Sequence, residues 1–504
     1  MVRLPTVGGD TGDWGSILNE FLSVELNTDG TLKRGGDIDT AQATANAKYT
    51  KPGTGIPLTD LASAVQTTIN NAIQVGDQIL YAADYGAVFD GSTDDASALQ
   101  SAITAANSSD KILMLPPGTA IVGTPLSISG PITIVGSGRE STILKAANGL
   151  NDYVIKFTGG SPGVGIVGAK FADFSIDGNA ANQTAGGGIL ADGAVQCSFE
   201  RLHFYSLYNW GLKLGPTTGG GFGHHNRVVS CLFDNSGASA GFGGGVWVTS
   251  NDENWFLATD FEFLGGSSAP IGTAPIMLYD QAGLQFITSC NFVNGSNNCI
   301  GVRVQNAFKT KIVGCTFDGV PGDNIFLAAN KCVVIGNVIT QPGDGGSVAA
   351  SGIHLEFNTH FNVVTANSLE TSDGAGETRS LIREESTGGG GDNIITGNST
   401  TWGGVAPTVS LIESAGTNTI VRNNIGWVTD NEGTATVASG STTVAVNHGL
   451  ESAPALQNIS VTPTNNLGTA AKFWISGITT TQFTINVDAD PGATTATFVW
   501  NARM

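Results

Sequence analysis

Residues 333–340 read VVIGNVIT, and the same pattern returns at 363–370 (VVTANSLE) and at 394–401 (IITGNSTT). The copies belong to a longer series of strand ends, which fall at Ile176, Phe204, Phe233, Phe263, Phe292, Phe317, Ile339, Leu369, Thr400 and Ile425. The spacing ranges from 22 residues (317 to 339) to 31 residues (369 to 400). A repeat of this length built from short strands indicates stacked units that share one core. The sequence therefore predicts a parallel β-helix.

A column of small polar or thiol side chains supports this alignment. The residues two positions before the later strand ends are Cys290, Cys315, Asn337, Asn367, Asn398 and Asn423. Stacked asparagines can hydrogen-bond to one another along a parallel stack, and cysteine can act there as a small buried hydrophobe. We interpret all of them as structural.

A second strand in each turn alternates in polarity, as in Val302-Arg303-Val304. Alternation sends the flanking aliphatics into the core and the middle residue outward. The outward residues should form one column with a step of about 4.8 Å. Its members are Lys213, Trp247, Met277, Arg303, Phe326 and His354. The predicted fold is all-β: a right-handed, single-stranded parallel β-helix of about ten turns.

The two ends of the chain differ from the repeat. Apolar residues at helical spacing predict short helices at 13–24 and 59–75, joined by a stretch too poor in apolar residues for a core. We expect residues 1–78 to form an attachment or assembly module, although a leader that packs on its own chain remains an alternative. The repeat with its helical cap is expected over 79–427. Alternating segments after it predict a β-sandwich-like domain at 428–504.

Composition excludes several classes of protein. Glycine contributes 70 of 504 residues, and the net charge of -20 repels phosphate backbones, so no nucleic-acid partner is expected. The same charge favours neutral over strongly anionic polymers. The six cysteines lack metal-ligand spacing, so no metal site is expected from them. No secretory signal and no apolar run long enough to span a membrane is found, so export would use lysis or assembly onto a particle.

A local pattern near residue 80 resembles a known family. It comprises Tyr85-Gly86-Ala87, Asp90-Gly91, Thr93-Asp94-Asp95, a helix at 96–106 and Leu115-Pro116-Pro117-Gly118. This pattern resembles the N-terminal cap of the pectate-lyase-like superfamily, the β-helix group that includes phage tailspikes and polygalacturonase-like enzymes. The cap implies the fold but no particular reaction, because enzymes and non-enzymes share it.

Both ends of the chain are similar to segments of phage tail or fibre proteins. The similar segments are Trp14-Gly-x-Ile-Leu-Asn near the start and Val461-Thr-Pro-Thr-Asn near the end. The resemblance implies a polysaccharide ligand, a homotrimer and attachment to a phage baseplate or tail through the N-terminal module. It also implies a place on the virion tail or outside cells.

Two sets of carboxylates are candidates for catalysis. Glu356 and Glu384 align in adjacent turns, about 5 Å apart, which is the separation that retaining glycosidases use. The alternative interpretation is a pair of solvated carboxylates next to arginines. Asp280, Asp252 and Glu253 are expected in loops near Trp247 and form the second set.

The outer column supplies the candidates for binding sugars. Trp247 can stack on a sugar ring, or contact a neighbouring subunit instead. Arg303 and His354 can bind an acidic sugar or serve a lyase, and the same face offers further contacts from Lys213, Phe326 and Tyr279.

No cofactor is expected. Asp488 and Asp490 could bind calcium, although acidic residues before Pro491 more often form a turn.

Three functions remain open on the sequence. The favoured one is a tailspike-like protein that binds and cleaves a bacterial surface polysaccharide, by hydrolysis or, as the less favoured route, by β-elimination. The second is a non-catalytic receptor-binding or adhesion protein. The third is a free enzyme that acts on fructans or uronans.

Overall fold

The computed structural model describes residues 26–27, 40–44, 62–63, 65–67 and 78–504, the last range without 159–164, 216–222, 235–243, 265–273, 280–281, 296–298, 347–348, 375–376 and 386–389. The chain divides into two compact units, Met1–Asp77 and Gln78–Met504. In the first unit, residues 40–44 and 65–67 are helical. The predicted helix at 13–24 lies outside the described residues.

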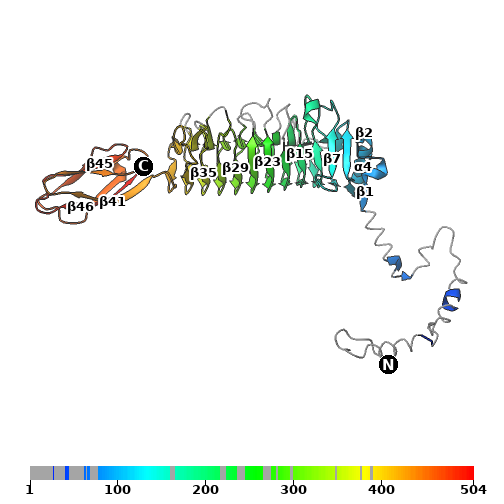
Figure 1. Cartoon of the computed structure of the whole chain (residues 1–504), viewed down its shortest axis with the longest axis horizontal. Helices are drawn as coiled ribbons and strands as arrows, with labels where there is room; N and C mark the ends of the chain where they lie inside the picture. Colours follow the sequence, from blue (N-terminus) through cyan, green and yellow to red (C-terminus); the bar gives the residue numbers. More distant parts are fainter. Residues whose placement is uncertain are drawn as a thin grey trace. The chain divides into compact units, whose positions relative to one another are not determined.

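A helical cap closes the first turn of the solenoid. Helix α4 (Ala96–Ser109) packs its buried Leu99 and Ile103 into the same core as the strands. It lies next to β1 and β2 at one end of the stack of turns (Figure 1). The carboxylate of buried Asp95 accepts hydrogen bonds from the backbone N–H groups of Val88 (2.7 Å) and Phe89 (3.0 Å). Asp95 is therefore a structural residue of the cap.

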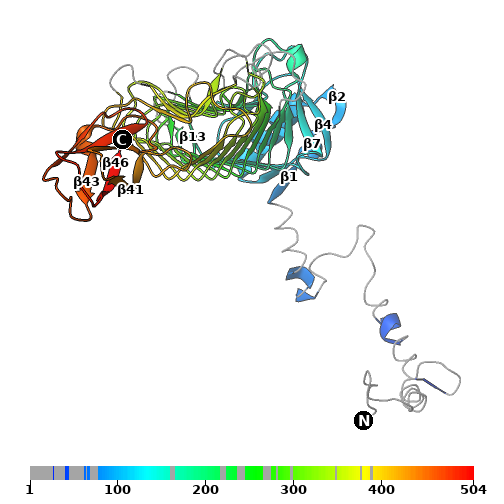
Figure 2. The same ribbon diagram turned by 60° about the vertical axis from the view of Figure 1, so that its left-hand side comes forward.

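The solenoid of about ten turns has three long parallel sheets, whose strands lie side by side in successive turns (Figures 1 and 2). The 13-stranded sheet contains β1 (Ile79–Tyr81), β3 (Ile112–Met114), β6 (Thr133–Val135), β10 (Lys170–Ala172), β14 (Ser198–Glu200), β18 (Arg227–Val229), β22 (Trp255–Leu257), β25 (Phe286–Thr288), β28 (Lys311–Val313), β31 (Val333–Ile335), β34 (Val363–Thr365), β37 (Ile394–Thr396) and β40 (Ile420–Arg422). The 12-stranded sheet contains β2 (Asp90–Asp94), β4 (Gly118–Val122), β7 (Thr142–Ala146), β11 (Ser175–Asp177), β15 (His203–Tyr205), β19 (Leu232–Asp234), β23 (Asp260–Leu264), β26 (Asn291–Gly295), β29 (Thr316–Asp318), β32 (Val338–Thr340), β35 (Ser368–Glu370) and β38 (Ser399–Thr401). The 11-stranded sheet contains β5 (Leu126–Ile128), β8 (Ile155–Phe157), β12 (Ile189–Ala191), β16 (Trp210–Leu214), β20 (Gly244–Thr249), β24 (Ile276–Tyr279), β27 (Val302–Gln305), β30 (Ile325–Ala328), β33 (Ala350–Leu355), β36 (Thr378–Glu384) and β39 (Ile412–Ser414).

Stacked phenylalanines fill part of the core. Phe204, Phe233, Phe261, Phe292 and Phe317 follow one another with ring centroids 4.5 to 5.0 Å apart and nearly parallel planes. The predicted strand end at Phe263 is therefore wrong by two residues, because Phe233 pairs with Phe261 in the ladder. The other phenylalanines lie where the repeat predicts them.

The asparagine column is a hydrogen-bonded ladder. The side-chain Nδ2 of Asn337 donates to Oδ1 of Asn367, and that of Asn367 donates to Asn398, each at 2.9 Å. The next member is Asn424, also at 2.9 Å, where the sequence alignment placed Asn423. These side chains are buried and satisfy turn backbone, so their role is structural.

Antiparallel strands follow the solenoid. One sheet joins β41 (Asp430–Val437), β46 (Ala496–Arg503) and β43 (Ile459–Pro463). The other joins β42 (Thr443–Asn447), β45 (Gln482–Val487) and β44 (Phe473–Ser476). Their alternating inward residues share a core around Phe483, Phe498 and Trp500, as the predicted sandwich requires.

Candidate functional site

The outer face of the 11-stranded sheet carries the predicted column. The ladder pairs Lys213 with Trp247, and continues through Met277, Arg303, Phe326 and His354. The column then extends to Arg383 and Glu413. The predicted register of this face is confirmed.

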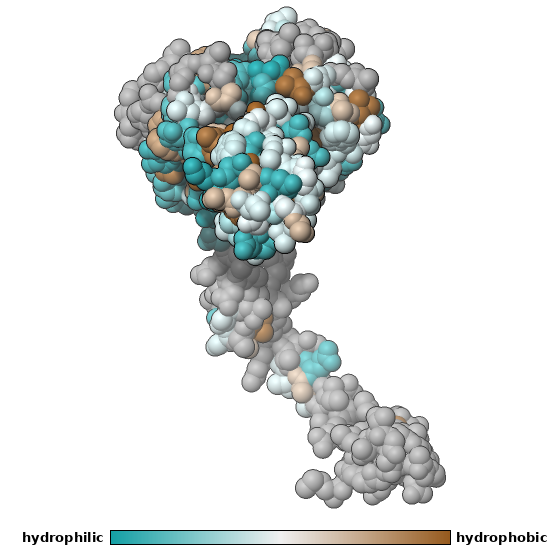
Figure 3. Space-filling model, turned by 90° about the vertical axis from the view of Figure 1, so that its left-hand side faces the viewer, coloured by the Kyte–Doolittle hydropathy of each residue, from teal (hydrophilic) through white to brown (hydrophobic). Residues whose placement is uncertain are grey.

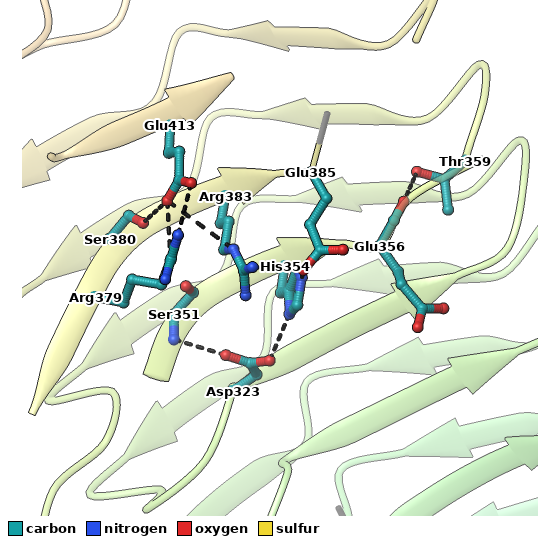
Figure 4. A network of polar contacts seen from close by, with 10 residues as sticks. All are labelled: Asp323, Ser351, His354, Glu356, Thr359, Arg379, Ser380, Arg383, Glu385 and Glu413. Atoms are coloured by element: carbon teal, nitrogen blue, oxygen red, sulfur yellow. Dashed lines mark hydrogen bonds and ion pairs between the residues drawn. The ribbon is translucent and has the colours of Figure 1, made fainter. Parts of the chain in front are cut away.

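His354 is the centre of a charged network (Figure 4). Its Nδ1 lies 2.6 Å from Asp323 Oδ2, and its Nε2 lies 3.1 Å from Glu385 Oε1. The other oxygen of Asp323 accepts the backbone N–H of Ser351 at 2.7 Å. The two carboxylates therefore hold the His354 ring from both of its nitrogens.

Two arginines continue this network along the sheet. Arg383 pairs with Glu385 (2.5 Å), and Arg379 holds Glu413 through two hydrogen bonds of 3.1 and 2.9 Å. Ser380 donates a third bond to Glu413. Burial raises the pKa of Glu413, but the hydrogen bonds and charge of Arg379, together with Ser380 and Arg383, lower it below the usual value. The two arginines therefore pair with two of the three carboxylates of the network.

The predicted alignment of Glu356 with Glu384 is wrong by one residue. The ladder pairs Leu355 with Glu384, so Glu356 follows Leu355 as Glu385 follows Glu384. The side chain of Glu384 points inward and is 1% exposed. It accepts bonds from Ser414 Oγ (2.5 Å), Thr419 Oγ1 (2.6 Å), Asn393 Nδ2 (2.7 Å) and the backbone N–H of Gly416 (3.1 Å).

Glu356 borders a hollow of about 380 Å³ on the surface. Phe308 and Phe357 in its wall are 50% and 49% exposed. The amide side chains of the wall are Gln305, Asn306, Asn330 and Asn358. Figure 4 shows the Glu356 carboxylate pointing away from His354. Exposed aromatic rings beside amides and a carboxylate suit a sugar, which has apolar faces and many hydroxyl groups.

Trp247 lies in an aromatic group farther along the same face. Trp210 and Tyr279 contact it edge-on, with centroid distances of 5.2 and 6.4 Å. The ammonium of Lys213 lies 5.0 Å from its ring centroid, and burial lowers the pKa of this lysine. A sugar that stacks on Trp247 therefore has to share the face of the indole ring with the Lys213 ammonium.

Two other predicted binding residues are largely covered. Phe326 is 8% exposed, because Ala274 and Ile300 pack on it. Arg303 lies over this ring, 5.0 Å from its centroid, and donates to Gln305 at 3.0 Å. His354 is 5% exposed. The predicted outward direction of Phe326 and His354 is correct, but other segments of the chain cover both side chains and limit their access to a ligand.

The second predicted acid set is only partly within the described chain. Asp280 lies outside the described residues. Asp252 was expected in a loop, but it belongs to the short strand β21 (Asn251–Asp252), which pairs with β17 (Gly223–His224). Burial raises the pKa of Asp252, which accepts the backbone N–H of Gly283 at 2.7 Å. Glu253 pairs with His225 at 2.6 Å.

The acidic pair near the end of the chain holds loops together. Asp488 accepts the backbone N–H groups of Ala471 and Lys472, and Asp490 accepts those of Gly440 and Gly492. Across the part of the chain that the structure describes, no group of three or more Asp, Glu, His or Cys residues is arranged to hold a metal ion. No helix among these residues is both long and apolar enough to cross a bilayer.

Sequence reasoning missed Asp323, Glu385 and Glu413. Counting two further steps along the outer column would have reached Arg383 and Glu413, since the ladder continues unbroken. Asp323 precedes β30 in a turn, where alternation gives no signal.

Comparisons with known proteins agree on the fold. Residues 80–188 match the family model described as rhamnogalacturonase A/epimerase, pectate lyase-like. The chain is similar to the mannuronan C-5 epimerase AlgE6 A-module of Azotobacter vinelandii, with 16% identity, a TM-score of 0.50, and coverage of 68% of this chain and 98% of that one. It is also similar to the tailspike protein gp49 of Pseudomonas phage LKA1, with 12% identity, a TM-score of 0.55, and coverage of 84% and 99%. No curated protein sequence matches the chain.

Proposed function

We propose, on the premise that the chain is a pectate-lyase-like parallel β-helix, that the outer face of its 11-stranded sheet binds an extracellular polysaccharide and cleaves it by hydrolysis. One observation carries the proposal: Glu356, which borders a hollow with exposed aromatic walls, and Glu385 occupy equivalent positions in adjacent turns. Because the backbones of adjacent turns are about 4.8 Å apart, rotation of the Glu356 side chain toward Glu385 would give the carboxylate separation of retaining glycosidases.

The two carboxylates have different surroundings, which suits different roles. Glu385 forms an ion pair with Arg383 and contacts His354, so it is assigned as the nucleophile that attacks the anomeric carbon. Glu356 lies at the hollow and is assigned as the acid that gives its proton to the leaving oxygen. Water, activated by Glu356, then releases the sugar from Glu385.

The contacts of His354 favour hydrolysis over β-elimination. A lyase base must accept a proton from the sugar ring. Both nitrogens of His354 already face carboxylates, which leaves no lone pair directed at a substrate. Its role in the proposal is to position Glu385.

The biological setting is part of the same proposal. The likeness to a phage tailspike supports a place on the tail of a virion, and the family resemblance supports a homotrimer. Residues 1–78 would attach the protein to the tail, residues 79–427 would bind the glycan, and residues 428–504 would form the terminal domain.

The test is incubation of the purified full chain with a panel of bacterial capsular and secreted polysaccharides. Chain length, reducing ends and absorbance of unsaturated uronates are followed together. Hydrolysis predicts shortening with new reducing ends and no such absorbance. Glu356→Gln and Glu385→Gln should each reduce the rate by about 10²- to 10⁴-fold, the usual contribution of a positioned acid or base.

The control variant is Glu370→Gln, an exposed carboxylate on the 12-stranded sheet. It should keep full activity. Loss of activity in this variant alone would move the site to the other face. Binding without shortening across the panel would support the non-catalytic adhesion protein instead.

A further inference from the structure

Two consecutive histidines lie at the surface of the solenoid, where the short strand β17 (Gly223–His224) ends. His224 is the last residue of the strand, and His225 follows it with a left-handed backbone (φ 59°). Both side chains are partly exposed. On the face of the molecule in Figure 3, hydrophobic side chains form separate spots among hydrophilic ones, whereas this pair is distinguished by its coordinating nitrogen atoms.

The two imidazole rings face each other nitrogen to nitrogen. His224 Nδ1 lies 2.5 Å from His225 Nδ1, and the ring centroids are 4.8 Å apart with planes at 80°. The chain has six histidines, and the structure describes all of them. The ring nitrogens of the other four contact carboxylates or backbone groups. His224 and His225 are therefore the one pair among the described residues in which two imidazole nitrogens converge.

A carboxylate determines which nitrogen of His225 is available as a ligand. His225 Nε2 lies 2.6 Å from Glu253 Oε2. An ionised carboxylate only accepts hydrogen bonds, so Nε2 carries the hydrogen, and in the neutral ring Nδ1 presents its lone pair toward His224. Histidines that bind metal ions usually have their other ring nitrogen held by a carboxylate or carbonyl in this way.

The surroundings of the pair favour a cation. Asp252 is the ladder partner of His224 in the next turn and interacts with it electrostatically, so two carboxylates lie beside the two imidazoles. The ring of His225 also lies against Trp255, with centroids 5.7 Å apart and planes at 23°, which limits its rotation. The side chains of His225 and Glu253 are 41% and 36% exposed, so an ion can reach them from the solvent.

We infer that His224 and His225 chelate one transition-metal ion through their two Nδ1 atoms. Imidazole nitrogens bind Zn²⁺, Ni²⁺ and Cu²⁺ at about 2.0–2.1 Å, whereas Ca²⁺ and Mg²⁺ prefer oxygen ligands. Two nitrogens at this distance from one ion are about 3.0–3.4 Å apart, so the rings need to open by about 0.5–0.9 Å from their present contact. The hydrogen on His224 Nδ1 moves to Nε2 of the same ring, and both rings stay neutral.

Two protein nitrogens leave coordination positions of the ion open. Closed structural sites use four protein ligands. The part of the chain that the structure describes offers no set of three acidic, histidine or cysteine side chains arranged around one ion. Water or the hydroxyl groups of a ligand fill the remaining positions, so the ion binds reversibly, and a chelator removes it without unfolding the protein.

The test is calorimetric titration of the full chain, purified without a histidine tag, with Ni²⁺. The wild type should bind one ion per chain at this pair, and His224→Gln and His225→Gln should each weaken binding by at least about tenfold. Glu253→Gln should weaken it by roughly tenfold, because Glu253 orients a ligand and does not bind the ion. The control is His360→Gln: His360 lies 3.6 Å from an Asp392 oxygen but faces no second imidazole, so binding should not change.

A second measurement does not depend on the folding of any variant. Crystals of the wild type soaked in NiCl₂ should show an anomalous scattering signal between the two Nδ1 atoms, and soaking in CaCl₂ should leave the electron density there unchanged. Absence of Ni²⁺ binding, an anomalous signal only at another histidine, or binding that survives both His224→Gln and His225→Gln would overturn the inference.

Discussion

Replacing Glu384 by alanine should destabilise the last turns of the solenoid. Glu384 is 1% exposed and accepts four hydrogen bonds. In the variant, Asn393 Nδ2 keeps a bond to the carbonyl of Thr359, but the hydroxyls of Ser414 and Thr419 and the N–H of Gly416 lose an acceptor. Each buried donor without an acceptor costs roughly 1–3 kcal/mol, and water can replace part of the lost hydrogen bonding. We therefore expect the free energy of unfolding to fall by about 3–5 kcal/mol.

The assay is guanidinium unfolding of the full chain together with hydrogen exchange of peptides from 378–422. Protection should fall in these peptides first, because each turn of a solenoid contacts only its neighbours. Glu356→Ala is the control, since that side chain borders an open hollow, and it should change the free energy of unfolding by less than about 0.5 kcal/mol. Equal stability of the two variants would refute the structural role of Glu384.

Three further predictions concern binding, stability and pH. Phe357→Ala should weaken glycan binding about tenfold, or about 1.4 kcal/mol, without changing the unfolding midpoint, as calorimetry and denaturation would show. Asn398→Ala interrupts the ladder of asparagine side chains and should lower the free energy of unfolding, measured with denaturant, by about 2–4 kcal/mol. Unchanged stability would count against a stabilising role of the ladder. Hydrogen bonds from Arg201 hold the pKa of Asp173 below its usual value, so their contribution is present at neutral pH and is lost as the pH falls through the lowered pKa. Arg201→Gln should therefore be less stable than the wild type at pH 7, by under about 1 kcal/mol, and this difference should disappear as the pH falls through the lowered pKa of Asp173.

The fold was predictable because the solenoid repeats one pattern many times. Phe204, Phe233, Phe292 and Phe317 all occupy the inner positions that their spacing indicates. Single turns were harder to align: in the turn with Phe261 and Phe263, both residues fit an inward position, and only the ladder distinguishes them.

The candidate site was predictable only in outline. The outer column follows from alternation. Glu384, however, lies at an inward position, where alternation predicts an apolar residue, so the sequence wrongly places its carboxylate on the surface. Its burial depends on Ser414, Gly416 and Thr419, which come from the next turn. No local pattern shows that a carboxylate will meet three donors about 30 residues later.

The most direct test of the proposed glycan site is a crystal structure of the Glu356→Gln variant with an oligosaccharide of the polysaccharide that the wild type shortens. We predict that the sugar occupies the hollow next to residue 356, with one ring against Phe357 and its scissile bond near Glu385. A sugar bound only on the 12-stranded sheet or on the C-terminal domain would contradict the account.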